Sequence, residues 1–126
     1  AWSSRLLQNV LLNLLTDPAT TEIVARAEAA YAERRSTLVD CLADHGIAVP
    51  GRSGFNLWLE VEDETNALIA LSAGGIGAAP GSPFVVGNGG GSHLRLTVAT
   101  VAGDFGELAA VLAQAASIPP GRRVGA

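Results

Sequence analysis

The sequence has no lysine and no methionine, and Cys41 is its only cysteine. Without a lysine the chain can form neither a phosphate-binding P-loop nor a Schiff base, so it cannot start covalent imine chemistry by itself. One cysteine cannot make an internal disulfide, and with two histidines it is too little for a typical structural zinc site. Because no methionine is present, Ala1 is not a translation start, and we expect the chain to belong to a longer protein.

Charge is also scarce: eight basic residues, all arginine, stand against twelve acidic ones, for a formal net charge of −4. Proteins that bind DNA directly normally carry a basic patch, which this composition does not supply. We interpret the pair Arg34–Arg35 as part of a solvated helix face. No basic leader precedes an apolar stretch, and the longest early apolar run, 10–15, is far below the roughly 18 residues of a membrane span. These features favour a cytoplasmic protein without a membrane partner.

The first 45 residues have the periodicity of two helices. Residues 1–16 are expected to form an amphipathic helix that packs on another domain or a partner, since apolar side chains recur every three or four positions. That apolar stripe consists of Trp2, Leu6, Leu7, Val10, Leu11, Leu14 and Leu15. Asp17-Pro18 is a typical helix start, and the second helix is predicted from about Pro18 to His45, with Gly46 as its left-handed cap.

After Gly46 the sequence alternates as in strands, with helices in between. Strands are predicted at 47–49, 55–61, 76–79 and 93–100, and helices after Asp63 or Thr65 and after Asp104. We therefore predict an α+β domain over residues 17–116, in which long N-terminal helices precede a small antiparallel or mixed sheet with helices packed on one face. Residues 117–126, rich in proline and glycine, are predicted to form a flexible tail.

Several apparent motifs favour structural interpretations. The glycines of 75–81 miss the dinucleotide-binding spacing and follow a helix instead of a strand. Ser53, even if grouped with His93 and Asp63, is not on a nucleophile elbow. Cys41 is expected to pack as a small apolar group. The acidic run 60–64 is expected to be a solvated corner at a helix start.

Arg95 stands out because it occupies the middle of a predicted strand, between core leucines. A guanidinium at this position could face a cleft and hold a carboxylate through two parallel hydrogen bonds. It could equally lie on an open sheet face and form a cross-strand ion pair with Glu60. The residue pattern alone does not decide between these two alternatives.

Four segments together resemble a known family. They are Tyr31-x-x-Arg34-Arg35, Gly54-Phe55-Asn56-Leu57-Trp58, Ala79-Pro80-Gly81-Ser82-Pro83-Phe84 and His93-Leu94-Arg95-Leu96-Thr97-Val98-Ala99. Their order and spacing resemble the C-terminal small domain of fold type I pyridoxal-phosphate-dependent aminotransferases of class I/II. The turn at 51–56 and the strand at 95–100 are most similar to the MocR subfamily of GntR-type transcriptional regulators, in which an aminotransferase-like region follows a winged-helix DNA-binding domain.

The resemblance implies roles for particular residues. Arg95 would bind the α-carboxylate of an amino-acid substrate or effector, Pro80, Gly81 and Ser82 would border the entrance of the site, and Asn56 would lie near it. The cofactor lysine and the phosphate-binding residues of the family belong to its large domain, outside this chain. Pyridoxal phosphate is therefore expected in the full-length protein, and this segment alone is expected to bind no cofactor and to be inactive.

Three hypotheses follow. The first is a regulator segment that binds an amino acid or amine effector, works as a homodimer and contacts DNA only through a winged-helix domain outside this chain. The second is the small domain of a genuine aminotransferase, in which Arg95 fixes the substrate. The third is a stand-alone α+β interaction module that dimerises through the apolar stripe of residues 2–15.

Overall fold

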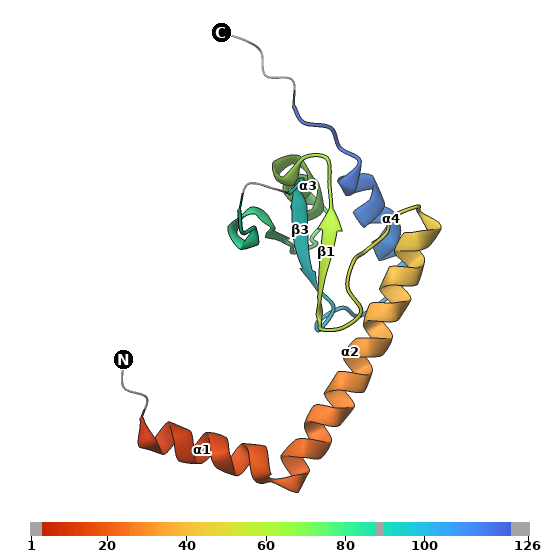
Figure 1. The fold of residues 1–126 in the computed structure, drawn as a ribbon. Coiled ribbons are helices and arrows are strands. Elements are labelled where there is room, and N and C mark those ends of the chain that lie inside the picture. The colour runs from red at the N-terminus through yellow and green to blue at the C-terminus, as the bar shows by residue number, and fades with distance from the viewer. Residues whose placement is uncertain (1–3, 88–89, 122–126) are drawn as a thin grey trace.

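Two helices joined at Asp17 form a bent arm that leads into the body of the molecule (Figure 1). The computed structural model describes residues 4–87 and 90–121, with α1 at Arg5–Thr16 and α2 at Pro18–Asp44. The Asp17 carboxylate accepts hydrogen bonds of 2.9 Å from the backbone N–H and the hydroxyl of Thr20, which also lower the pKa of Asp17. The predicted break between the two helices is thus confirmed at Asp17.

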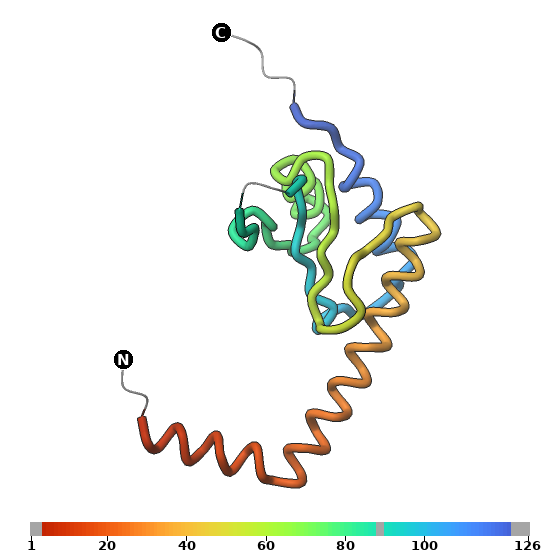
Figure 2. Tube along the Cα trace, in the orientation of Figure 1, coloured from red at the N-terminus to blue at the C-terminus, as the bar shows by residue number. Residues whose placement is uncertain are grey.

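The segment after α2 turns back along that helix, and the strand predicted at 47–49 was wrong (Figure 2). Gly46 has a φ of 77°, as predicted for a left-handed cap, and the chain then follows α2 without pairing to the sheet. The carbonyls of Pro50 and Gly51, just beyond this segment, accept hydrogen bonds from Arg35 of α2. An arginine fork on the helix therefore holds the backbone between this segment and the sheet close to α2.

Three short strands make an antiparallel sheet in the order β1-β3-β2. Their bounds are β1 Asn56–Glu60, β2 Ala79–Pro80 and β3 His93–Thr97. β1 and β3 are shorter than predicted. The strand predicted at 76–79 is confirmed only at Ala79, because the N–H of Ile76 still closes the end of the preceding helix by bonding to Leu71 O. In the register, Leu57 faces Leu96 and Leu59 faces Leu94.

The α-helices of the body pack on one face of this sheet, as predicted. Besides α2 these are α3 (Glu64–Ala73), capped by Asp63, and α4 (Phe105–Ala116), capped by Asp104, while a short 3-10 helix, η1 (Ser82–Phe84), follows β2. The core contains Leu38, Leu42, Leu57, Leu59, Val61, Ala67, Leu71, Leu94, Leu96, Val98, Ala109, Leu112 and Ala115. Cys41 packs against this cluster, as predicted for a small apolar group. The opposite sheet face carries the other side chains of β1 and β3, among them Arg95.

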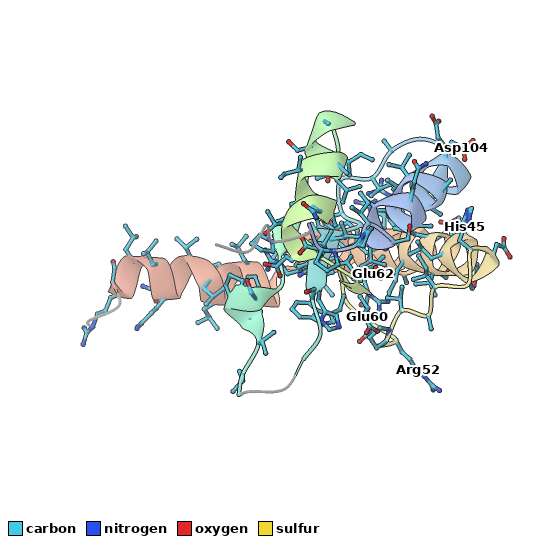
Figure 3. All side chains as sticks on the ribbon, turned by 90° about the horizontal axis from the view of Figure 1, so that it is seen from above. His45, Arg52, Glu60, Glu62 and Asp104 are labelled. Atoms are coloured by element: carbon cyan, nitrogen blue, oxygen red, sulfur yellow. The ribbon has the colours of Figure 1, made fainter. Side chains whose placement is uncertain are left out.

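The helix α1 projects from the body with its leucines exposed (Figure 3). None of its residues is buried, and Leu6 and Leu15 keep about 70% of their surface (71% and 70%). The helix predicted within residues 1–16 is confirmed, whereas Trp2 lies outside the described residues. The helix α4 ends at Ala116, directly before the predicted tail. Within that tail, residues 122–126 also lie outside the described residues. In the described part of the chain, no helix has the length and apolar character needed to cross a membrane.

Candidate functional site

Arg95 occupies the centre of the sheet, on the face turned away from the core. It lies opposite Trp58 of β1 on one side and Ala79 of β2 on the other. Its guanidinium carbon lies over the ring of Phe84, 4.4 Å from the ring centroid. A ring in this position contacts the flat face of the guanidinium and leaves the N–H groups at the guanidinium edge accessible.

The edge of the Arg95 guanidinium has no acceptor among the described residues, where it makes neither a hydrogen bond nor an ion pair. Glu60, the alternative partner considered from the sequence, lies opposite His93 in the register. Within the described residues, Arg26 forms an ion pair with Glu22, and both side chains are exposed on α2. Arg95 therefore presents a charged fork whose geometry matches a carboxylate.

An aromatic pair lies next to Arg95 on the same sheet face. The rings of Trp58 and His93 are stacked, with centroids 5.2 Å apart and planes 23° from parallel. The Nδ1 atom of His93 lies 2.7 Å from the carbonyl oxygen of Gly91, which fixes the imidazole at one edge. Together with Phe84, this pair gives the arginine apolar neighbours on two sides.

The turn after β2 is tied to Glu64 at the start of α3. Oε2 of Glu64 accepts hydrogen bonds of 2.9 Å from the backbone N–H groups of Gly81 and Ser82, and Oε1 accepts one of 2.8 Å from the Ser82 hydroxyl. The expectation that the acidic run 60–64 is simply a solvated corner was therefore wrong for Glu64. Asp63 likewise has a defined function, since it caps α3 through the N–H of Asn66 at 2.7 Å.

Opposing influences act on the pKa of Glu64. Partial burial and the neighbouring charge of Asp63 raise it, burial being the largest single influence, but the hydrogen bonds from Ser82 and Gly81 together outweigh both and lower the pKa. For a carboxylate with a lowered pKa, the stabilisation is present above its ordinary pKa and is lost as the pH falls through the lowered value. These hydrogen bonds to the turn are therefore intact at neutral pH.

Gly81 is required by the close approach of this turn to β3. Its N–H also bonds to His93 O at 2.8 Å, and a Cβ on Gly81 would lie 2.5 Å from that oxygen. Gly81→Ala should therefore displace the turn and lower the free energy of unfolding by about 1–3 kcal/mol, measured by urea denaturation. Gly77→Ala is the matched control, because its Cβ would meet nothing within 4 Å. Equal effects of the two substitutions would contradict the close packing at Gly81.

The arginines of α2 are anchors of the fold, which corrects the expectation of a solvated face. Arg35 is buried, with 5% of its surface exposed, and donates to Asn56 O at 2.7 Å, Gly51 O at 2.9 Å and Pro50 O at 3.3 Å. Arg34 donates to Ala99 O at 2.6 Å. The two side chains thus connect α2 to the entrance of β1 and to the end of β3. By contrast, Arg52 extends away from the body (Figure 3).

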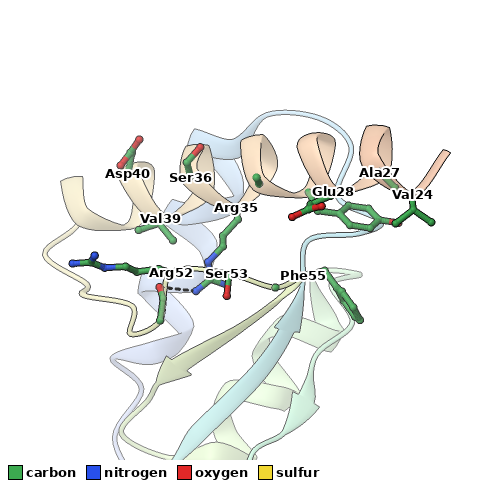
Figure 4. Close-up of a pocket in the computed structure, with 14 residues that line it drawn as sticks. Val24, Ala27, Glu28, Arg35, Ser36, Val39, Asp40, Arg52, Ser53 and Phe55 are labelled. Carbon is green, nitrogen blue, oxygen red and sulfur yellow. Dashed lines mark hydrogen bonds between the residues drawn. The ribbon is translucent and has the colours of Figure 1, made fainter. Parts of the chain in front are cut away.

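An apolar groove of about 760 Å³ runs between α2 and the turn at 51–55 (Figure 4). Arg35 extends from α2 into this groove toward the turn. At one end of the groove, the ring centroids of Tyr31 and Phe55 are 6.1 Å apart. The other apolar lining residues are Val24, Ala27, Ala32 and Val39. Arg95 does not line this groove, so the groove and the unpaired guanidinium are separate features.

The remaining residues singled out from the sequence lie around Arg95. Ala79 of β2 is the cross-strand partner of Arg95. Pro80 and Gly81 directly follow Ala79, and Ser82 begins η1. Asn56 is exposed on the same sheet face as Arg95 but lies opposite Thr97, at the beginning of β1. The geometry thus groups the turn with Arg95 and leaves Asn56 at the margin.

The sequence matches a family model described as "Aminotransferase class I and II" over residues 1–124. It is also 32% identical over 102 residues to the "Vitamin B6 salvage pathway transcriptional repressor PtsJ" of Salmonella typhimurium strain LT2. This alignment covers 79% of the chain but 23% of the relative, and it confirms the resemblance to MocR-type regulators. No solved structure matches significantly. The α-helices and the antiparallel sheet of the described residues agree with a small aminotransferase domain, and the chain belongs to the class I and II aminotransferase family.

Proposed function

We propose that this chain is the small domain of an aminotransferase-like effector-binding region in a transcriptional regulator, and that Arg95 binds the carboxylate of an amino-acid effector. The observation that carries the proposal is the guanidinium itself, which is stacked on Phe84 and has no acceptor among the described residues. A charged arginine on an open sheet face with an unpaired fork is suited to a planar anionic group. The regulatory part of the proposal is supported by the repressor named among its relatives.

The chain would supply the carboxylate side of the effector site and leave cofactor chemistry to the rest of the protein. Pyridoxal phosphate, when bound, supplies an aldehyde that reacts with amines. The chain has no lysine that could hold that aldehyde, whereas its Arg95 could bind the effector's carboxylate. Phe84 and Trp58 would limit the access of water to the guanidinium and so strengthen its hold on the anion.

The exposed helix α1 and the groove along α2 would pack against other parts of a longer chain or its dimer. This chain spans 23% of the relative's length, so most of such a protein lies outside it. The leucines of α1 form an exposed apolar stripe, and the groove exposes mostly apolar surface, although charged residues such as Glu28 and Asp40 also line it.

The family match supports equally a genuine aminotransferase, in which Arg95 would fix the substrate. The coding sequence upstream distinguishes the two proposals. A winged-helix domain before the large domain identifies a regulator, and its absence favours the enzyme.

The proposed function predicts a response of the full-length protein to an amino acid. We expect that, in a screen of L-amino acids, at least one changes the absorbance of pyridoxal phosphate bound to the full-length protein and also changes its affinity for its operator DNA. The isolated 126-residue chain, which has no lysine, should give no absorbance change beyond that of free pyridoxal phosphate mixed with the same amino acid. A full-length protein whose bound cofactor responds to no amino acid would contradict the proposal.

A further inference from the structure

We propose that Glu64 is a positioning residue for Arg95, acting through the turn at 81–84 and the ring of Phe84. The proposal rests on the proposed function, because it matters only if Arg95 binds a carboxylate. Glu64 belongs to α3 and forms its hydrogen bonds with Gly81 and Ser82, whereas Arg95 belongs to β3 and contacts Phe84. Its influence must therefore pass through the turn.

The first step is the attachment of the turn to α3. Both oxygens of the Glu64 carboxylate are used, and they accept from three donors on two consecutive residues, Gly81 and Ser82. Hydrogen bonds to a charged acceptor are about twice as strong as neutral ones. Glu64 is in the first turn of α3, whose start is itself fixed by the Asp63 cap. The acceptor is thus held on a regular element.

The second step leads from the turn to the Phe84 ring. The N–H of Phe84 bonds to Gly81 O at 2.8 Å, so the turn is closed over the residues that Glu64 holds. The bond from Gly81 N–H to His93 O attaches the same turn to β3. The Phe84 side chain is 51% exposed and therefore has limited packing of its own. Its position above Arg95 depends on the backbone of the turn.

The third step concerns the arginine. A free arginine side chain samples many rotamers, and ordering it on binding lowers the affinity. Phe84, at 4.4 Å, holds the guanidinium in one orientation before an anion arrives. Loss of the Glu64 contacts should therefore weaken the binding of a carboxylate by about 3- to 10-fold, the size expected for ordering one such side chain.

The test uses the full-length protein and the L-amino acid that gives the largest cofactor response in the screen above. Glu64→Gln keeps the size of the side chain but removes its negative charge, so its hydrogen bonds with Gly81 and Ser82 become neutral ones of about half the strength. Glu62→Gln is the matched control, since it removes the same charge from an exposed neighbour in the same acidic run. We expect Glu64→Gln to weaken amino-acid binding 3- to 10-fold and to speed hydrogen exchange at the amides of Gly81, Ser82 and Phe84. Glu62→Gln should do neither.

A double-mutant cycle tests the route through Phe84. Phe84→Leu should weaken binding by a similar factor, and Glu64→Gln should add little to it, because both changes release the same guanidinium. Additive effects, or no effect of Glu64→Gln beyond that of Glu62→Gln, would overturn the proposal. If Arg95→Gln weakens binding and Glu64→Gln does not, the function of Arg95 stands and only the positioning role falls. If Arg95→Gln has no effect, the proposed function falls, and this inference with it.

Discussion

Replacing Arg35 with alanine is expected to lower the free energy of unfolding by about 2–4 kcal/mol, with urea denaturation of the 126-residue chain as the measurement. The side chain is buried and satisfies three backbone carbonyls that precede or begin β1. Truncation would remove a charged donor from these acceptors, and a hydrogen bond to a charged group contributes about 1.5–3 kcal/mol. The acceptors belong to exposed residues, so water would replace part of each lost bond. Partial access of water from the groove reduces the sum (Figure 4).

Two variants make the Arg35 result interpretable. Arg26→Ala removes an arginine from the same helix whose side chain is 70% exposed and paired only with Glu22, so a change within about 0.5 kcal/mol is expected. Arg35→Lys keeps the charge but loses the planar fork, and should fall between the two. If Arg35→Ala costs no more than Arg26→Ala, the three hydrogen bonds do not stabilise the fold.

Replacing Arg95 with glutamine is expected to weaken the binding of an amino acid to the full-length protein by about 100-fold. Glutamine preserves polarity and approximate length but removes the positive charge and the two-pronged donor edge. A hydrogen bond to a charged group contributes about 1.5–3 kcal/mol, so the loss of two corresponds to a factor of 100 or more. Titration of the cofactor absorbance measures the change, and the sheet should remain folded because Arg95 makes no hydrogen bond with the described residues through its side chain.

Arg95→Lys and Arg26→Gln separate the sources of this effect. Lysine restores the charge as a single point without the fork, so its affinity should lie between those of the wild type and Arg95→Gln. Arg26→Gln removes the same charge far from the sheet and should leave the affinity unchanged. An equal loss in Arg26→Gln would mean that only the overall charge of the domain matters.

Local sequence signals predicted most of the fold. Aspartates at 17, 63 and 104 mark helix starts because their side chains accept from N–H groups two or three residues on. Alternation in β1 and β3 identified the buried face, since a strand exposes successive side chains to opposite sides. The segment 47–49 has the same apolar character but no strand beside it. Whether such a segment joins a sheet depends on a strand distant in the sequence that could pair with it, which no local pattern reveals.

The sequence predicted a residue of the candidate site only where its side chain was unusual for its place in a strand or helix. Arg95 was singled out because a charge in the middle of a strand needs a reason. Glu64 belongs to a run of acidic residues that looks like any solvated helix start, and its partners at 81 and 82 are 17 and 18 positions away. The prediction that Arg35 lies on a solvated helix face was wrong because its carbonyl partners are also distant in the sequence. The local sequence of a helix does not distinguish a buried arginine from an exposed one.

The central claim is that Arg95 binds a carboxylate, and comparison of an amino acid with its decarboxylated amine tests it most directly. Both compounds are titrated into the full-length protein loaded with pyridoxal phosphate, in the wild type and in Arg95→Gln. If Arg95 holds the carboxylate, the substitution weakens the amino acid by about 100-fold and leaves the amine within about twofold, so that the wild-type preference for the amino acid disappears. An equal loss for both compounds, or a preference that survives in Arg95→Gln, would contradict the claim.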